Sequence, residues 1–290
     1  MNNMENVAIK DELENEDELL NQIKDVLHKA RTYTPKVGVF GNSGVGKSSL
    51  CNALFGKEIA KISDVEACTR EPQEILIGDA KKGGIVLVDV PGVGEDPEHH
   101  KEYIELYKSL STKLDLVIWA IKSDDRNYAS AIQAYKDVLE PNLKKCPVVF
   151  VITQADKIKP DFDWDRMNNK PSEKQLANLG LKANDISARF DVSTNKIISI
   201  SADYPYNLVE LVNKVVEVLP NEKKYGFTRE TKEENVSEEA AIKAEKGIFD
   251  HVKEVVGDAF EVVKDVVVAT IVKSAPKIIK SIGSWVKSWF

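Results

Sequence analysis

The stretch GNSGVGKSSL, residues 41–50, constrains the fold of this chain more than any other part of the sequence. It follows a short apolar run, KVGVF, and matches the pattern GxxxxGK[ST], with Gly41, Gly46, Lys47 and Ser48 at the fixed positions. Glycines there let the backbone wrap around a phosphate group, and the N-terminus of the following helix attracts the anion. The stretch therefore predicts a strand, a phosphate-binding loop and a helix, in that order.

Short apolar runs separated by helical patterns extend from about residue 36 to residue 219. This alternation is typical of a mainly parallel sheet covered by helices on both faces. Only Lys81, Lys82, Gly83 and Gly84 separate two of the runs, which indicates a hairpin and hence one antiparallel strand at the sheet edge. We therefore expect an α/β fold with six strands: KVGVF, EILIGDA, GIVLVDV, LDLVIWAI, VVFVIT and KIISISA.

Changes in composition divide the chain into four parts. Residues 1–34 hold an acidic leader and an amphipathic helix, and residues 35–220 form the α/β domain, which closes at Pro220. Residues 221–236 are rich in charge and short of large aliphatic side chains, so we interpret them as a linker. Residues 237–290 return to helical periodicity and form an α-helical appendage. The apolar positions of the first helix are Leu19, Leu20, Ile23, Val26, Leu27 and Ala30.

Composition predicts a cytoplasmic location. Three cysteines, Cys51, Cys68 and Cys146, show no metal-ligand spacing, and their odd number argues against a disulfide framework. The acidic start lacks the features of a signal peptide, and no apolar run approaches the length of a membrane span. The formal net charge of −7 gives no global reason to expect nucleic-acid binding.

A second motif, IVLVDVPGVGE, ends a strand at Asp89 and places Gly92 three residues later. Asp89 is placed to hold Mg²⁺ through its water shell, and the Gly92 N–H can bond a terminal phosphate. Lys47 would pair with the phosphates, and the Ser48 hydroxyl would coordinate the same Mg²⁺. Between the two motifs, Thr69 is the hydroxyl best placed to complete the metal site, although an ordinary loop residue is the alternative.

With these motifs and with DVPG, TQAD and SISA in the same order, the sequence resembles the GTPases of the Era-like, TrmE-like and septin-like class. Three stretches, GKSSLCNALFG, SDVEACTRE and VDVPGVGED, look like a bacterial, often prophage-borne group named after YfjP and YeeP. The resemblance covers about residues 38–219. It implies a P-loop GTPase domain, or G domain, that hydrolyses GTP to GDP and phosphate with Mg²⁺ as its cofactor and acts as a nucleotide-dependent switch.

The TQAD tetrapeptide departs from the NKxD motif that reads the base in this class. Thr153 and Gln154 replace the first two residues, while Asp156 keeps its place, so we expect weaker binding with the choice of guanine intact. Ala202 would meet guanine O6, and Ser201 would steady Asp156. The resemblance and the phosphate loop together predict these nucleotide-binding residues: Asn42, Ser43, Gly44, Val45, Gly46, Lys47, Ser48, Ser49, Thr153, Gln154, Asp156, Ser201 and Ala202. Lys47, Thr69 and Gly92 are the expected catalytic residues, and Ser48, Thr69 and Asp89 the expected metal ligands.

The catalytic glutamine of Ras-like enzymes is missing, because Val93 stands at its position. Gly44 replaces the asparagine of potassium-dependent relatives, so we do not expect that route either. His99 and His100 are more typical of solvated helix residues than of catalytic ones. Slow turnover that self-association or a partner accelerates is the leading hypothesis, with a homodimer through the G domain among the expected partners. The alternative is a septin-like assembly module with negligible hydrolysis.

Two further stretches contain candidate functional patterns. DFDWD, residues 161–165, resembles the start of a calcium loop, but Arg166 replaces the required glycine, so an acidic insertion is the better interpretation. Residues 273–290 place lysines opposite Ile and Trp side chains on a helix. This helix either docks on the protein or contacts a protein partner or the inner face of the membrane. We do not expect nucleic acid among the partners, since the appendage lacks an RNA-reading motif.

Overall fold

The computed structural model describes residues 18–42, 44–56, 73–79, 83–89, 100–126 and 128–279. Six strands form one sheet in the order β2-β3-β1-β4-β5-β6, in which only the β2–β3 pair is antiparallel. The predicted α/β fold is confirmed, including the antiparallel strand at the edge. The strands are β1 Lys36–Phe40, β2 Gln73–Ile77, β3 Ile85–Asp89, β4 Leu116–Lys122, β5 Val148–Thr153 and β6 Ile197–Ser199.

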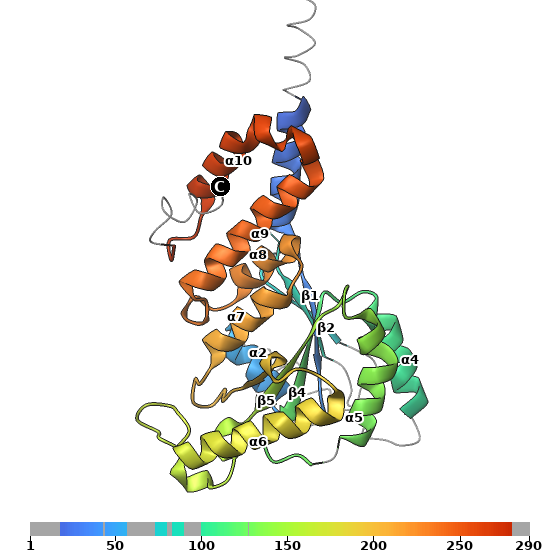
Figure 1. The fold of residues 1–290 in the computed structure, drawn as a ribbon, viewed down its shortest axis with the longest axis vertical. Coiled ribbons are helices and arrows are strands. Elements are labelled where there is room, and N and C mark those ends of the chain that lie inside the picture. The colour runs from blue at the N-terminus through green and yellow to red at the C-terminus, as the bar shows by residue number, and fades with distance from the viewer. Residues whose placement is uncertain are drawn as a thin grey trace, which may run out of the picture.

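Helices cover both faces of this sheet (Figure 1). On one face, α4 (His100–Ser111), α5 (Ala129–Ala134) and α6 (Glu173–Phe190) pack on an aromatic cluster centred on Trp119. On the other face lie α2 (Lys47–Phe55) and α7 (Leu208–Val218), which bury aliphatic side chains. Strands β4 and β5 are buried on both faces, which explains why they read as almost continuous apolar runs in the sequence.

The strand register brings the predicted motifs to one edge of the sheet. Val39 of β1 lies opposite Asp89 of β3, and Lys122 of β4 lies opposite Thr153 of β5. Because these strands are parallel, their carboxyl ends all reach the edge where the chain leaves β1 at Gly41. Ligands of open α/β sheets bind beyond this edge.

The N-terminal helix, residues 18–32, packs against the C-terminal helices rather than standing apart (Figure 1). Its Ile23, Leu27 and Ala30 share an apolar cluster with α9 (Glu238–Val256) and α10 (Phe260–Ser274). The Arg31 guanidinium crosses this interface and donates two hydrogen bonds, of 3.2 and 2.7 Å, to the fully buried carboxylate of Glu245. The N-terminal helix, α9 and α10 thus form one helical layer.

The charged stretch 221–236, whose composition predicts a linker, is largely helical and packed. Helix α8 (Asn221–Glu230) buries Phe227 completely, with its ring 5.7 Å from that of Phe55. Arg229 donates to the carbonyl oxygens of Tyr33 (3.2 Å) and Gly84 (3.1 Å). Composition did not predict this helix, because a single buried aromatic ring lies among many charged residues. The division into domains stays a prediction.

The apolar periodicity of the appendage also continues across a boundary between two helices. Gly257, with a φ of 56°, ends α9, and a short turn leads into α10, so the apolar positions from Ile248 to Val267 lie on two helices. Helix α10 ends at Ser274, two residues before Pro276, as predicted. The predicted terminal helix lies mostly outside the described residues, which stop at Ile279. Within the described part of the chain, no helix is both long and apolar enough to cross a membrane.

Candidate functional site

The loop between β1 and α2 has the backbone geometry of a phosphate cradle. Gly41 and Gly46 have φ angles of 140° and 91°, values that residues with a side chain rarely adopt. A Cβ atom on Gly41 would lie only 2.4 Å from the carbonyl oxygen of Ala120, so the sheet itself requires glycine there. The first turn of α2 contains no acidic residue, which leaves its N-terminus suited to an anion.

Lys47, the first residue of α2, turns back across this loop. Its Nζ donates to the carbonyl oxygens of Gly41 (2.9 Å) and Asn42 (3.2 Å). The ammonium group is thus held beside the cradle that a phosphate would occupy. Ser48 and Ser49 follow in the same turn, as the sequence pattern predicts.

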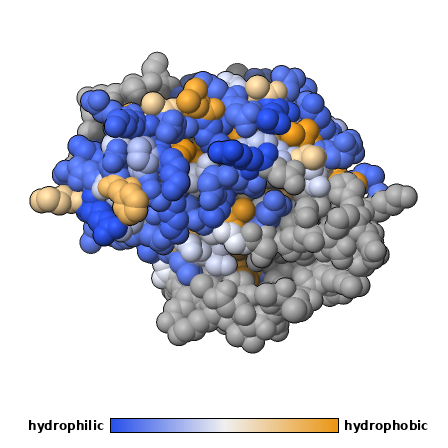
Figure 2. Space-filling view, turned by 90° about the horizontal axis from the view of Figure 1, so that it is seen from below, coloured by the Kyte–Doolittle hydropathy of each residue, from blue (hydrophilic) through white to orange (hydrophobic). Residues whose placement is uncertain are grey.

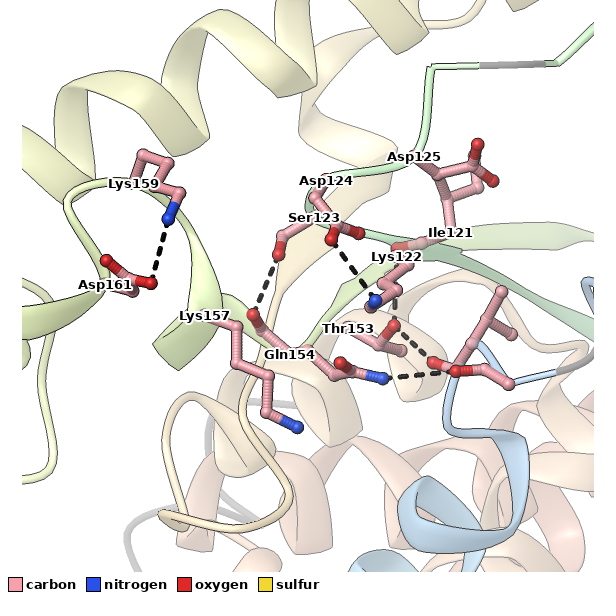
Figure 3. Close-up of polar contacts among 12 residues, drawn as sticks. Ile121, Lys122, Ser123, Asp124, Asp125, Thr153, Gln154, Lys157, Lys159 and Asp161 are labelled. Carbon is pink, nitrogen blue, oxygen red and sulfur yellow. Dashed lines mark hydrogen bonds and ion pairs between the residues drawn. The ribbon is translucent and has the colours of Figure 1, made fainter.

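The loop after β5 is tied directly to the phosphate loop (Figure 3). Thr153 Oγ1 donates to the carbonyl oxygen of Val45 at 2.6 Å, and Gln154 Nε2 donates to that of Gly44 at 3.3 Å. Both residues replace the usual ones of the base-reading motif, yet both bridge the two loops. Thr153 therefore braces the phosphate loop through its hydroxyl.

A residue that the motifs did not reveal, Ser123, holds the same loop from the end of β4. Its Oγ donates to the carbonyl oxygen of Gln154 at 2.9 Å, and its N–H donates to that of Thr153 at 3.1 Å. These bonds support the left-handed conformation of Gln154, whose φ is 54°. The available signal was position, since Ser123 is the polar residue that follows an apolar strand.

Asp156 is presented in a fixed orientation. Its side chain belongs to a residue that is only 8% exposed, and its Oδ1 accepts a 2.6 Å hydrogen bond from the Ser201 hydroxyl. Ser201 is fully buried, and its oxygen accepts from the Tyr204 N–H at 3.1 Å, which directs the hydroxyl hydrogen to Asp156. The loop after β5 is also linked to the end of β6, because the Ala155 N–H donates to Ile200. Within the described residues, Asp156 Oδ2 has no hydrogen-bond partner and remains available to a ligand.

One cavity brings the two loops and the end of β6 together. Lys157 and Asp203 line it although neither belongs to a predicted motif position, and their charged groups lie 3.6 Å apart. Their place in the cavity wall depends on tertiary structure, because in the sequence each is only a charged residue next to a motif residue. The predicted residues on its wall are Gly46, Ser49, Thr153, Gln154, Asp156 and Ala202.

Several predicted residues have no described side chain. Ser43, Thr69, Gly92, Val93 and His99 lie outside the described residues. The backbone of Asp89 ends β3 beside β1, and that of His100 begins α4, but their side chains are not described. Among the described side chains, no group of three carboxylate, imidazole or thiol ligands forms a metal site. The Mg²⁺ prediction therefore rests on the Ser48 hydroxyl and on the position of Asp89 in the sheet, a donor set that suits this hard cation.

Comparison with known proteins identifies the family. Residues 36–154 match the family described as 50S ribosome-binding GTPase. The uncharacterized protein YkfA of Escherichia coli (strain K12) is 36% identical over 206 residues, which cover 70% of this chain and 67% of YkfA. The uncharacterized protein YfjP of the same strain is 34% identical over 204 residues, with the same shares. The chain belongs to this GTPase family. The resemblance to the YfjP group is thereby confirmed, and GTP or GDP is the expected ligand of the site.

A solved structure of Era in complex with MgGDPNP and nucleotides 1506–1542 of 16S ribosomal RNA is also similar to this chain. The match has a TM-score of 0.46 at 24% identity and covers 64% of this chain and 57% of the Era chain. That Era structure contains RNA. The expectation that nucleic acid is absent from the partners of this chain stays a prediction.

Proposed function

We propose that this GTPase hydrolyses GTP to GDP and phosphate with Mg²⁺ and acts as a nucleotide-dependent switch. The observation that carries the proposal is the pair of hydrogen bonds from Thr153 and Gln154 to the phosphate loop, next to the buried Asp156. A cavity bounded by a phosphate cradle on one side and an oriented carboxylate on the other fits a nucleotide better than a simple phosphate.

Guanine is the base that Asp156 is suited to recognise. Its carboxylate accepts from the N1–H and the amino group of guanine, whereas adenine presents a lone pair at N1 and would leave the acid unpaired. Sites that require such a bond reject analogues without it by about 10⁴-fold or more. Ser201 keeps Asp156 Oδ1 in place, and the Ala202 N–H is assigned to guanine O6.

At the phosphate end, Lys47 is assigned to the β and γ phosphates, and the Gly92 N–H to the γ phosphate. Ser48, Thr69 and Asp89 would hold Mg²⁺, which neutralises phosphate charge when it is bound. This chain has Val93 where Ras-like enzymes carry glutamine, and valine cannot orient a water molecule. Turnover of the isolated protein should therefore be slow.

Helix α8 and the residues after it offer a route from the nucleotide to the helical layer. The Lys232 N–H and the Asn235 side chain donate to carbonyl oxygens at the end of α2, both at 2.8 Å. Arg229 donates to Gly84, which precedes β3. Thr69 lies in the sequence between α2 and β2, so the contacts of α8 and of the residues after it bracket the segment expected to sense the γ phosphate. A change at either end would reach α9, which packs against the N-terminal helix.

Phosphate release measured across protein concentrations tests the proposed reaction. A slow rate per molecule that rises with concentration supports hydrolysis aided by self-association. A fast rate that does not depend on concentration contradicts this account. Tight GTP binding with no phosphate release supports the alternative, a septin-like assembly module.

Gln154→Lys should raise the affinity for GTP about three- to tenfold. Lysine restores the family's residue, and its ammonium group would form a stronger, charge-assisted bond to the carbonyl oxygen of Gly44. Gln154→Met is the matched control, since it keeps the unbranched stem but removes the donor, and it should lower the affinity. Nucleotide titration of both variants checks this. Unchanged affinity in both would show that the bridge to Gly44 does not matter for binding.

Residues 273–290 retain two hypotheses, docking on the protein or contact with a partner or the inner face of the membrane. Ile279 is buried in the helical layer, which supports docking of at least the start of this segment. Co-sedimentation with liposomes distinguishes them when the full chain is compared with a truncation after Val272. Equal partitioning of the full chain and the truncation would exclude membrane contact through residues 273–290. The proposed cytoplasmic location would then need no membrane component.

A further inference from the structure

Residues 159–170, between β5 and α6, form a loop of fixed shape. Asp165 Oδ1 accepts from the N–H groups of Met167 (3.1 Å) and Asn168 (3.0 Å), and a backbone bridge joins Asp165 to Lys170. The Asn178 side chain of α6 donates to the carbonyl oxygen of Lys159 at 2.7 Å. The carboxylate of Asp165 is thus used for an internal turn, and the loop is secured from both sides.

Apolar side chains on this loop point in opposite directions. Trp164 is buried, with its ring 5.5 Å from that of Tyr206 and 5.9 Å from that of Tyr204, and it anchors the loop. Phe162 and Met167, by contrast, are 94% and 95% exposed. A well-held loop that exposes two large apolar side chains is typical of a contact surface, because the hydrophobic effect disfavours leaving both in water.

A cavity of about 1400 Å³ opens beside these two side chains. Its walls come from this loop, from α6 and from the segment after β4, and they include Phe162, Met167, Tyr128 and Leu181. Figure 2 shows this side of the molecule, where isolated hydrophobic residues stand out on a largely hydrophilic surface. The protruding side chains and the hollow that could receive such side chains therefore belong to the same patch.

The charges around the cavity are balanced. Six carboxylates and six cationic side chains line it, and some already pair within the chain, such as Lys159 with Asp161 (2.9 Å) and Arg189 with Asp185 (2.7 Å). A nucleic acid or an anionic membrane selects a surface with excess positive charge, which this patch lacks. A surface with equal numbers of both signs can instead meet a second copy of itself without net charge repulsion.

We propose that this patch is a homodimer interface, in which Phe162 and Met167 of each copy enter the cavity of the other copy. A two-fold symmetric contact requires that the same patch carry both the protruding and the receiving parts, as this one does. In such a contact, cations of one copy would pair with carboxylates of the other, since the patch carries both in equal number. Asp156, Lys157 and Asp203 line both this cavity and the nucleotide cavity, so the second copy would sit next to the base-reading loop.

Sedimentation velocity of the full chain over a wide concentration range tests the interface. The wild type should form dimers, and the double substitution Phe162→Ser, Met167→Ser should raise the dissociation constant at least about tenfold, as removal of central apolar anchors does. Both residues are exposed, so the fold should be retained, which circular dichroism checks. The matched control is Val262→Ser, an equally simple change at a 71% exposed residue of α10.

A wild type that stays monomeric at every concentration would overturn the proposal, as would a double variant that dimerises like the wild type. Equal loss of dimer in Val262→Ser would assign the contact to another surface and would also overturn it. The proposal does not require GTP hydrolysis, and its outcome is independent of the phosphate-release measurement.

Discussion

Asp156→Asn should abolish the preference for guanine nucleotides, with the ratio of GTP to ATP affinity falling from about 10⁴ towards one. The carboxylate can accept two hydrogen bonds from guanine, whereas an amide replaces one acceptor with a donor that faces the amino group of the base. Ser201 would still donate to Oδ1 of the asparagine, so the loop should keep its shape. Competition titrations with GTP and ATP measure the ratio.

Asp203→Asn is the matched control for this prediction. Asp203 lines the same cavity but pairs with Lys157 rather than with Ser201, so its loss should leave the preference for guanine in place. If Asp156→Asn bound GTP with unchanged selectivity, the interpretation of the base-reading loop would be wrong.

Arg31→Met should lower the free energy of unfolding by about 3–5 kcal/mol, because it leaves the buried carboxylate of Glu245 without its partner. The double substitution Arg31→Met, Glu245→Met removes both charges from the apolar cluster and should recover most of this loss. Arg189→Met is the matched control, since its ion pair with Asp185 is exposed and should contribute less than about 1 kcal/mol. Urea denaturation of the variants measures these differences. A single variant as stable as the wild type would show that the pair does not hold the helical layer.

The stability of Arg31→Met should depend on pH in a defined direction. Burial raises the pKa of Glu245, and Arg31 opposes that shift. Without Arg31 the pKa rises further, so the folded state takes up a proton at a pH where the unfolded chain does not. Stability contributed by this proton is present at low pH and is lost as the pH rises through the folded pKa. The deficit of Arg31→Met should therefore be smaller at mildly acidic than at neutral pH, and an equal deficit at both would contradict this explanation.

The sheet and the phosphate loop could be predicted because they depend on local patterns. Strands buried on both faces need apolar residues at nearly every position, and the loop needs glycines at Gly41 and Gly46. Helix α8 could not be predicted in this way. One ring, Phe227, and the hydrogen bonds of Arg229 fix it to distant parts of the chain, and charged composition gives no sign of such contacts.

The site residues fall into the same two groups, those that local motifs predict and those that depend on tertiary packing. Motif spacing identified Asp156, Thr153 and Gln154, because each stands at a set distance from a strand end. Ser123, Lys157 and Asp203 belong to the site only through the packing of three separate strand ends, which no short motif encodes. The exposure of Phe162 and Met167 could not be predicted either. The sequence alone does not show that Trp164 points inward and the other two side chains outward.

Titration of the purified protein with GTP, GDP and ATP in the presence of Mg²⁺ tests the central claim most directly. GTP and GDP should both bind, because the phosphate cradle and Asp156 serve each of them, and ATP should bind about 10⁴-fold more weakly. Binding of ATP as tight as that of GTP would contradict the assignment of Asp156 and of the cavity around it.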